Sequence, residues 1–398
     1  MGGVSEVVTP KRLKFFLRRD LLTNKYCVYI WGPPGVGKTE CVLQLAKELN
    51  LPVRVLNVAL EHPHTLGGFP VPSWKEKVMS KLPPKIISEL EGEGILFFDD
   101  FAAAEPQQQR VSLSLTTYRR VGDYVLPDGI RVIFASNRVK DFSYVVKPSL
   151  AILNRCKHYV LYPSLDDWCD WLRKVSVDLS EFDRKCWENV PREVAALVTT
   201  FLKFFPHHFF VEPSAMRDDV VDTVAFPTPR SWTNFMRDLG IYIKEKGYPD
   251  VTVDEVLRDK DDVLSLLVSW VGDTPAADFL KYTEVDRKKL NEMTRNWKKL
   301  KTLPIYEQSL YALFVYFSLF GEEEKDEFVS YITKNLHSEA LAVLSFHLKG
   351  DERVREGDKL QVAASALPQV IKETTRRDED VVEGEFNEED GFPVEEGF

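Results

Sequence analysis

Residues 27–39 read CVYIWGPPGVGKT. The first five are apolar and lead into a glycine, which is typical of a short buried parallel strand. The glycine-rich stretch that follows can aim several backbone N–H groups at an anion, in front of a helix that is predicted to begin at Lys38. In such a loop Lys38 would reach the outer phosphates of a nucleotide, and the Thr39 hydroxyl would bind Mg²⁺. The expected phosphate-binding residues are Gly32, Pro33, Pro34, Gly35, Val36, Gly37, Lys38 and Thr39.

Strand and helix signals alternate on both sides of this loop. The expected strands cover residues 26–31, 51–59, 95–98, 130–136 and 158–162, and the expected helices cover residues 10–21, 38–49, 84–90 and 106–119. This order predicts an α/β fold in which a parallel sheet is wound with helices. Residues 60–83 are rich in proline, glycine and histidine, and they are expected to be irregular or to form a hairpin.

Beyond residue 162 the strand signals stop. Residues 165–245 and 252–372 read as helices, one of which begins at Thr228-Pro229. We expect four parts: an α/β nucleotide-binding core over residues 1–163, a helical lid over 164–280, a helical C-terminal extension over 281–372 and a tail over 373–398.

The tail carries most of the charge imbalance. The net charge of the chain is −10, and residues 378–398 hold ten acidic residues and no basic one, so the rest is close to neutral. Such a tail is expected to be disordered, and it serves either solubility or docking, for which Phe386, Phe392 and Phe398 are suited. A neutral body offers no broad basic face, which argues against tight binding of nucleic acid.

The remaining composition indicates a cytoplasmic protein without a membrane segment. No run of about 18 uncharged apolar residues occurs, and the N-terminus lacks the pattern of a secretory signal. Five scattered cysteines form no C-x-x-C pair, which favours free thiols in a reducing compartment over a zinc or disulfide framework.

Polar residues follow two of the predicted strands. Asp99 ends the strand 95–98 and is a suitable second ligand for Mg²⁺, which usually takes one or two protein carboxylates. Asp100 either orients and deprotonates an attacking water or only caps the strand end. Asn137 follows the strand 130–136, where it either holds that water or serves as a turn residue.

With these residues in place, the chain resembles the AAA+ ATPases and, within them, the MoxR-like group of the helix-2-insert clade. The resemblance covers residues 10–280. It is carried by GPPGVGKT (Walker A), ILFFDD (Walker B), IFASNR (sensor 1), NRCKHYVL (the arginine-finger segment) and PTPRSW (the start of the sensor 2 helix). The stretch LGGFPVPSW resembles the insertion that decorates the second helix in this clade.

The resemblance implies further roles and partners. Arg155 would reach the outer phosphate in a neighbouring subunit, and Arg230 would contact the chain's own nucleotide from the lid, because charge on the phosphoryl oxygens must be offset. Without the family, Arg155 would read as an ordinary helix-end arginine. A finger supplied by a neighbour requires an oligomer, usually a six-membered ring. The implied ligands are ATP and Mg²⁺, and the implied client is a protein, often a von Willebrand A-type partner.

One departure concerns Walker B, where the family usually has Asp-Glu and this chain has Asp99-Asp100. Aspartate is one methylene shorter, so its carboxylate sits back by about 1.5 Å. A misplacement of that order can cost on the order of 10²-fold in rate. Two functions therefore stay open: an ATP-driven machine that remodels or assembles a protein client, and a nucleotide-gated scaffold that hydrolyses little. A nucleic-acid motor is a third, disfavoured function.

Overall fold

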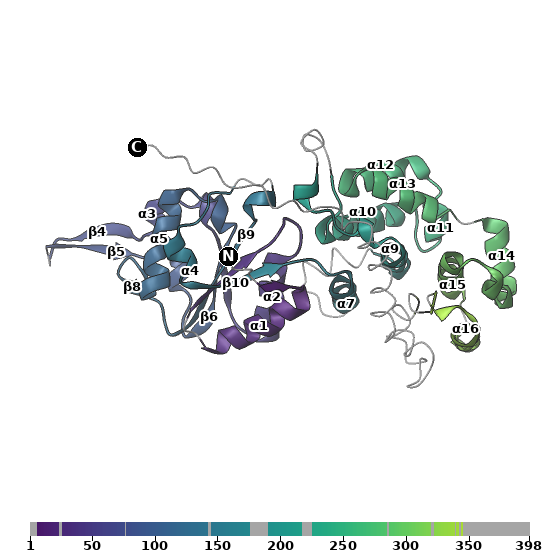
Figure 1. Ribbon diagram of the computed structural model, residues 1–398, viewed down its shortest axis with the longest axis horizontal. Helices are drawn as coiled ribbons and strands as arrows, with labels where there is room; N and C mark the ends of the chain where they lie inside the picture. Colours follow the sequence, from purple (N-terminus) through teal and green to yellow (C-terminus); the bar gives the residue numbers. More distant parts are fainter. Residues whose placement is uncertain are drawn as a thin grey trace, which may run out of the picture. The chain divides into compact units, whose positions relative to one another are not determined.

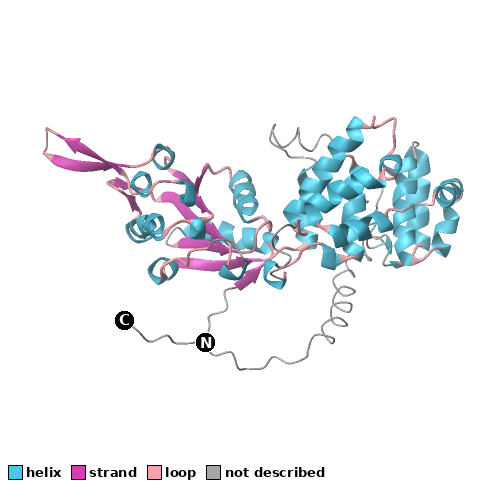
Figure 2. Ribbon diagram, turned by 90° about the horizontal axis from the view of Figure 1, so that it is seen from above, coloured by secondary structure: helices cyan, strands magenta, loops and turns pink. Residues whose placement is uncertain are grey.

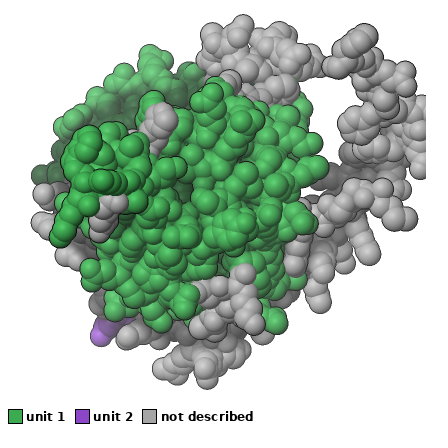
Figure 3. All heavy atoms as spheres, turned by 90° about the vertical axis from the view of Figure 1, so that its left-hand side faces the viewer, with its two compact units in different colours: residues 1–284 green, residues 285–398 purple. Residues whose placement is uncertain are grey.

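The computed structural model describes residues 6–23, 26–75, 77–141, 145–175, 190–216, 225–284, 286–319, 322–338, 340–341 and 344 of the 398-residue chain. The chain divides into two compact units, residues 1–284 and residues 285–398. Figure 3 shows the surface of unit 1.

Unit 1 is built on a six-stranded sheet with the order β1-β10-β2-β9-β6-β3, in which all neighbouring strands run parallel. These strands are β1 (Glu6–Val8), β2 (Cys27–Trp31), β3 (Val53–Asn57), β6 (Glu93–Asp99), β9 (Gly129–Ser136) and β10 (Cys156–Leu161). The predicted parallel sheet is confirmed. The edge strand β1 was missed, because three residues are too few for a periodic signal.

Helices cover both faces of the sheet, as Figures 1 and 2 show. Successive strand residues point to opposite faces, so Tyr29 and Phe98 belong to one buried cluster, whereas Ile30 and Phe97 belong to the other. The helices around this sheet are α1 (Pro10–Thr23), α2 (Lys38–Glu48), α3 (Pro63–Leu66), α4 (Lys85–Ser88), α5 (Pro106–Tyr118) and α6 (Leu150–Leu153).

Two hairpins extend from this α/β layer. Strands β4 (Phe69–Ser73) and β5 (Val78–Leu82) form the first, within the segment expected to be irregular or a hairpin. Strands β7 (Arg120–Val121) and β8 (Tyr124–Val125) form the second, which was not predicted. Single-turn 3₁₀ segments follow several strands: η1 (Val58–Leu60), η2 (Phe101–Ala103) and η3 (Val139–Asp141).

The second half of unit 1 is helical. Its elements are α7 (Leu165–Val175), α9 (Arg192–Phe204), η4 (Pro206–His208), η5 (Pro213–Ala215), α10 (Pro229–Glu245), α11 (Val253–Val256), α12 (Lys260–Val271) and α13 (Asp273–Tyr282). Aromatic side chains from α9, α10 and α13 meet in its core: Phe201, Trp232, Phe235 and Phe279 are fully buried. Thr228 caps α10, and Pro229 occupies its first position, as the sequence predicts.

Unit 2 is helical in its described part, with α14 (Arg287–Arg295), η7 (Trp297–Thr302), α15 (Ile305–Ser318) and α16 (Glu322–Asn335). Phe328 and Leu300 are fully buried in it. The helical region that was predicted after the sheet is thereby confirmed as far as it is described, whereas the acidic tail lies outside the described residues. None of the helices in the described ranges is long and apolar enough to span a membrane.

Candidate nucleotide site

The phosphate loop joins β2 to α2 and packs against the start of α10. Gly35 has φ 78°, and a Cβ atom placed on it would lie 2.7 Å from the Thr228 hydroxyl oxygen, so only glycine fits there. The backbone N–H of Arg230 donates to the carbonyl of Gly35 over 3.2 Å. The first turn of α10 therefore holds the middle of the loop.

Lys38 begins α2 and is buried inside the loop. Its ammonium donates to the carbonyls of Gly32 (2.8 Å) and Pro33 (2.9 Å) and to Oδ1 of Asn137 (2.7 Å). Burial lowers the pKa of Lys38 to about 8, against the opposing influence of the Asp100 and Asp99 carboxylates. The predicted sensor residue Asn137 thus lies within hydrogen-bond distance of the predicted phosphate lysine.

Thr39 and Asp99 form the second pair of the site. The Thr39 hydroxyl donates to Oδ2 of Asp99 over 2.6 Å, which joins the start of α2 to the end of β6. The described residues contain no group of three or more His, Cys, Asp and Glu side chains that could hold a metal without other ligands. A hydroxyl and one carboxylate fit Mg²⁺, which takes oxygen ligands, keeps waters and shares its shell with substrate phosphates. These residues therefore fit the metal that the sequence predicted.

Asp100 stands directly after β6 in a left-handed conformation, with φ 48° and ψ 36°. Its backbone N–H donates to Oδ1 of Asp99 over 3.1 Å. Burial, and then the neighbouring Asp99 charge, raise the pKa of the Asp100 carboxyl, while Lys38 and Arg230 act in the opposite direction. Asp100 is thus half-buried among the charges of the site. Glu105, the nearest other acid along the chain, is engaged as the N-cap of α5.

Arg230 belongs to the same charge cluster, although its side chain is exposed. Its positive charge lowers the pKa of both Lys38 and Asp100, so it acts on the site from the first turn of α10. Six of the predicted residues are therefore brought together by hydrogen bonds or electrostatics at the carboxyl ends of β2, β6 and β9: Lys38, Thr39, Asp99, Asp100, Asn137 and Arg230.

Sequence reasoning missed an ion-pair network beside Asn137. The Arg138 guanidinium donates to both carboxylate oxygens of Asp141, whose side chain is fully buried, and to Oε1 of Glu212 over 2.7 Å. The exposed Lys140 also contacts Glu212, at 2.9 Å. The Arg138–Asp141 spacing was visible in the sequence, but the Glu212 partner lies 74 positions away and left no local signal. This network ties the turn after β9 to the segment that precedes α10.

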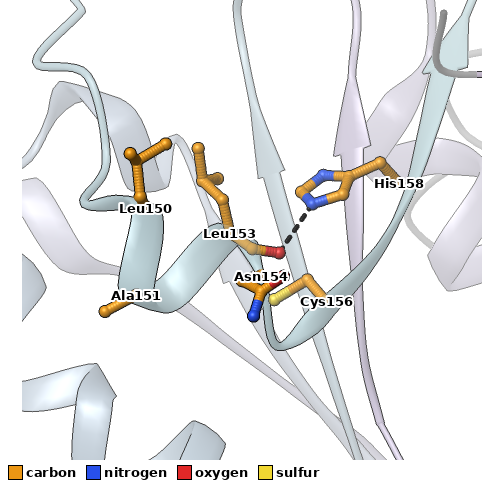
Figure 4. Close-up of a pocket in the computed structure, with 6 residues that line it drawn as sticks. All are labelled: Leu150, Ala151, Leu153, Asn154, Cys156 and His158. Carbon is orange, nitrogen blue, oxygen red and sulfur yellow. Dashed lines mark hydrogen bonds between the residues drawn. The ribbon is translucent and has the colours of Figure 1, made fainter. Parts of the chain in front are cut away.

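Arg155 stands apart from this cluster. It follows α6, it is exposed, and its guanidinium donates to the carbonyl of Ala151 in that helix. Figure 4 shows an open pocket of about 700 Å³ beside α6, lined by Leu150, Ala151, Leu153, Asn154, Cys156 and His158. His158 Nε2 lies 2.8 Å from the Leu153 carbonyl and fixes the wall of this pocket. The geometry leaves Arg155 on the surface.

Comparisons with known proteins agree with this geometry over the α/β part of the chain. Residues 28–163 match the family model of the ATPase family associated with various cellular activities (AAA). No curated protein matches the chain.

Solved structures show only distant likeness. NtrX from Brucella abortus, solved in complex with ADP, has 15% identity and a TM-score of 0.41, over 92% of this chain and 68% of that one. The RuvB Holliday junction branch migration motor of Thermotoga maritima has 12% identity and a TM-score of 0.35, over 75% of this chain and 79% of that one. At this level neither likeness carries an argument, and the assignment rests on the family match together with the loop geometry. Residues 28–163 are therefore similar to an AAA ATPase domain, and the protein is an ATPase.

Proposed function

We propose that the chain is a MoxR-like AAA+ ATPase that binds ATP with Mg²⁺, hydrolyses it in an oligomeric ring and uses the cycle to remodel or assemble a protein client. The observation that carries the proposal is the meeting of Lys38, Asp99 and Asn137 at one sheet edge. An ammonium, a carboxylate and an amide meet there at the carboxyl ends of β2, β6 and β9. Each of these three groups matches one role in phosphoryl transfer.

Each residue of this edge has a distinct role in the proposal. The glycine-rich loop cradles the phosphates, and Lys38 exchanges its carbonyl partners for phosphate oxygens. Thr39 and Asp99 hold Mg²⁺, which neutralises charge on the phosphates when it is bound. Asp100 accepts a proton from the attacking water, which Asn137 helps to orient. Arg230 offsets charge on the phosphates from the lid.

Arg155 is assigned to a neighbouring subunit's nucleotide. Three features of this region support a subunit interface: Arg155 is exposed, Leu150 in the preceding helix α6 is 76% exposed, and an open pocket lies beside α6. An arginine on such a face can complete a site only when a second copy packs against it.

The test is steady-state hydrolysis of ATP and GTP over a range of protein concentrations. Turnover per chain should rise with concentration for ATP, because Arg155 acts only between subunits. Mixing Arg155→Ala with Asp100→Asn chains should restore part of the activity that each variant lacks, since some interfaces then pair an intact acid with an intact finger. Co-assembled mixtures without any recovery would contradict action between subunits.

A nucleotide-gated scaffold is the second candidate, and the Asp100 geometry favours it. The shorter acid stands where the family has glutamate, so its carboxylate has less reach toward the attacking water. In that case ATP drives assembly in the same concentration series while hydrolysis stays near the uncatalysed rate.

A further inference from the structure

Two cysteines lie opposite one another in the central sheet. Cys27 begins β2 and Cys156 begins β10, and the parallel register of these strands pairs the two residues directly. Both side chains pack in the same buried cluster, on the face of the sheet that also carries Tyr29 and Leu56. The two cysteines are far apart in the sequence, so only the sheet brings their thiols together.

The spacing of the two strands suits a disulfide bond. Neighbouring strands in a sheet lie about 4.8 Å apart. That spacing falls within the range of roughly 4.4–6.8 Å that separates the Cα atoms of disulfide-bonded cysteines. A hydrogen bond already joins the two thiols. A bond between the sulfur atoms therefore needs rotation of the side chains rather than a rearrangement of the sheet.

The environment makes the two thiols unequal. The hydrogen bond from Cys156 lowers the pKa of Cys27 against the opposing effect of burial, and the positive charge of Arg119 adds to the lowering. The same hydrogen bond, together with burial, raises the pKa of Cys156. Because the thiolate is the reactive form of cysteine, Cys27 is suited to attack an oxidant and Cys156 to react second.

The pair can be reached through the pocket beside α6. Cys156 is only partly buried and lines this pocket, as Figure 4 shows, and Cys27 is its neighbour in the sheet. The cysteines Cys41 and Cys169 are instead buried, and burial raises the pKa of each of these thiols to about 12. A small oxidant should therefore react at the Cys27–Cys156 pair before it reacts at these two.

We propose that Cys27 and Cys156 form a redox-active pair that hydrogen peroxide converts into a reversible disulfide. The Cys27 sulfur attacks one peroxide oxygen: an S–O bond forms, the O–O bond breaks and water leaves. The Cys156 sulfur then attacks the resulting sulfenic sulfur: the S–S bond forms, the S–O bond breaks and a second water leaves. The two thiols lose two electrons and two protons, which reduce the peroxide to two waters.

The disulfide alters the turn that presents Arg155. Cys156 follows Arg155 directly, and its sulfur lies 3.4 Å from the Ile152 carbonyl oxygen in α6. The single Cys156 proton is shared between this carbonyl and Cys27. Oxidation removes the proton and fastens the start of β10 to β2. This consequence rests on the proposed role of Arg155 between subunits, and it predicts that the oxidised chain hydrolyses ATP more slowly.

The experiment treats the full folded chain with hydrogen peroxide, alkylates the remaining thiols in urea and identifies linked peptides by mass spectrometry without reduction. A peptide that joins Cys27 to Cys156 should appear, and dithiothreitol should restore both thiols. Cys156→Ser keeps a hydroxyl donor for the Ile152 carbonyl and should leave Cys27 as a sulfenic acid that dimedone traps. The matched control is Cys169→Ser, at a buried cysteine of α7, which should leave the linked peptide at its original yield.

A Cys27 thiol that survives peroxide, or that links to a cysteine other than Cys156, would overturn the proposal. ATP turnover is the second measurement: it should fall in the oxidised chain and recover with dithiothreitol, whereas Cys156→Ser should not respond to peroxide. Unchanged turnover in a chain that carries the disulfide would overturn the effect on Arg155. Detection of the linked peptide needs neither nucleotide nor turnover, so its failure is separable from failure of the proposed ATPase cycle.

Discussion

The phosphate loop and the hairpin β4–β5 (residues 69–82) each contain two prolines, and they present their side chains in opposite ways. In the loop, every polar group that the prediction named is engaged inside the protein: Lys38 with Asn137 and two carbonyls, Thr39 with Asp99. In the hairpin, the backbone is anchored at the base while the side chains face solvent. Buried polar groups suit catalysis, because a low dielectric strengthens their hydrogen bonds. An exposed set of apolar side chains instead suits binding to another surface.

The largest effect expected from this difference is at Lys38. Lys38→Ala should abolish measurable ATP binding while the fold stays intact, since one charge-assisted hydrogen bond contributes about 1.5–3 kcal/mol and Lys38 supplies more than one. The control is Lys75→Ala on the hairpin, which should bind ATP like the unaltered chain. Isothermal titration checks both. Equal ATP affinity in Lys38→Ala and the unaltered chain would disprove the loop assignment.

Asp100 should affect turnover rather than binding. Asp100→Asn should bind ATP and assemble, but hydrolyse it about 10²–10⁴-fold more slowly, because an amide cannot accept the proton of water. Asp100→Glu tests the reach of the acid. A rise in turnover would show that the native distance limits the rate, and a fall would show a site tuned to the shorter acid. A single-turnover assay separates these effects from product release, and unchanged rates in both variants would exclude Asp100 as the base.

The sequence could predict those residues because their signals are local. Lys38, Thr39 and Asp99 stand in fixed register with buried strands, so a parallel sheet necessarily brings their ends to one edge. The Arg138–Glu212 pair could not be predicted, because it joins segments 74 positions apart through an irregular stretch. The hairpin was expected only as one of two alternatives, since the prolines and glycines of residues 60–83 fit a loop equally well.

That missed network should matter for stability. Arg138→Ala leaves the fully buried Asp141 carboxylate without its guanidinium, so the free energy of unfolding should fall by about 3 kcal/mol. Lys140→Ala removes the exposed partner of the same Glu212 and should cost less than about 1 kcal/mol. Urea unfolding of the two variants is the measurement. Similar small losses in both would mean that the turn after β9 is held by other contacts.

ATP affinity should depend on pH through Lys38. The pKa of this lysine is lowered to about 8 by burial, and a bound phosphate favours the charged form and so raises it again. Below pH 8 the lysine is already charged and affinity should be flat. Above pH 8 binding must take up a proton, so affinity should fall by about tenfold per pH unit. Lys38→Arg, which stays charged, should lose this slope. A flat profile in the unaltered chain would contradict the burial of this charge.

The smallest effect on the free energy of unfolding is expected at Trp74, at the tip of the hairpin. A matched tryptophan in the helical core makes the comparison direct. Trp74→Ser should change the free energy of unfolding by no more than about 0.5 kcal/mol and leave ATP affinity unaltered, because the ring is 86% exposed. Trp232→Ser is the matched change in the helical core, where the ring is fully buried beside Phe201, and it should cost about 3–5 kcal/mol. Urea unfolding of both full-length variants supplies the two values. If Trp74→Ser approached the cost of Trp232→Ser, the hairpin would belong to the folding core rather than to a contact surface. A negligible cost in unfolding would show that the Trp74 side chain is not needed for folding.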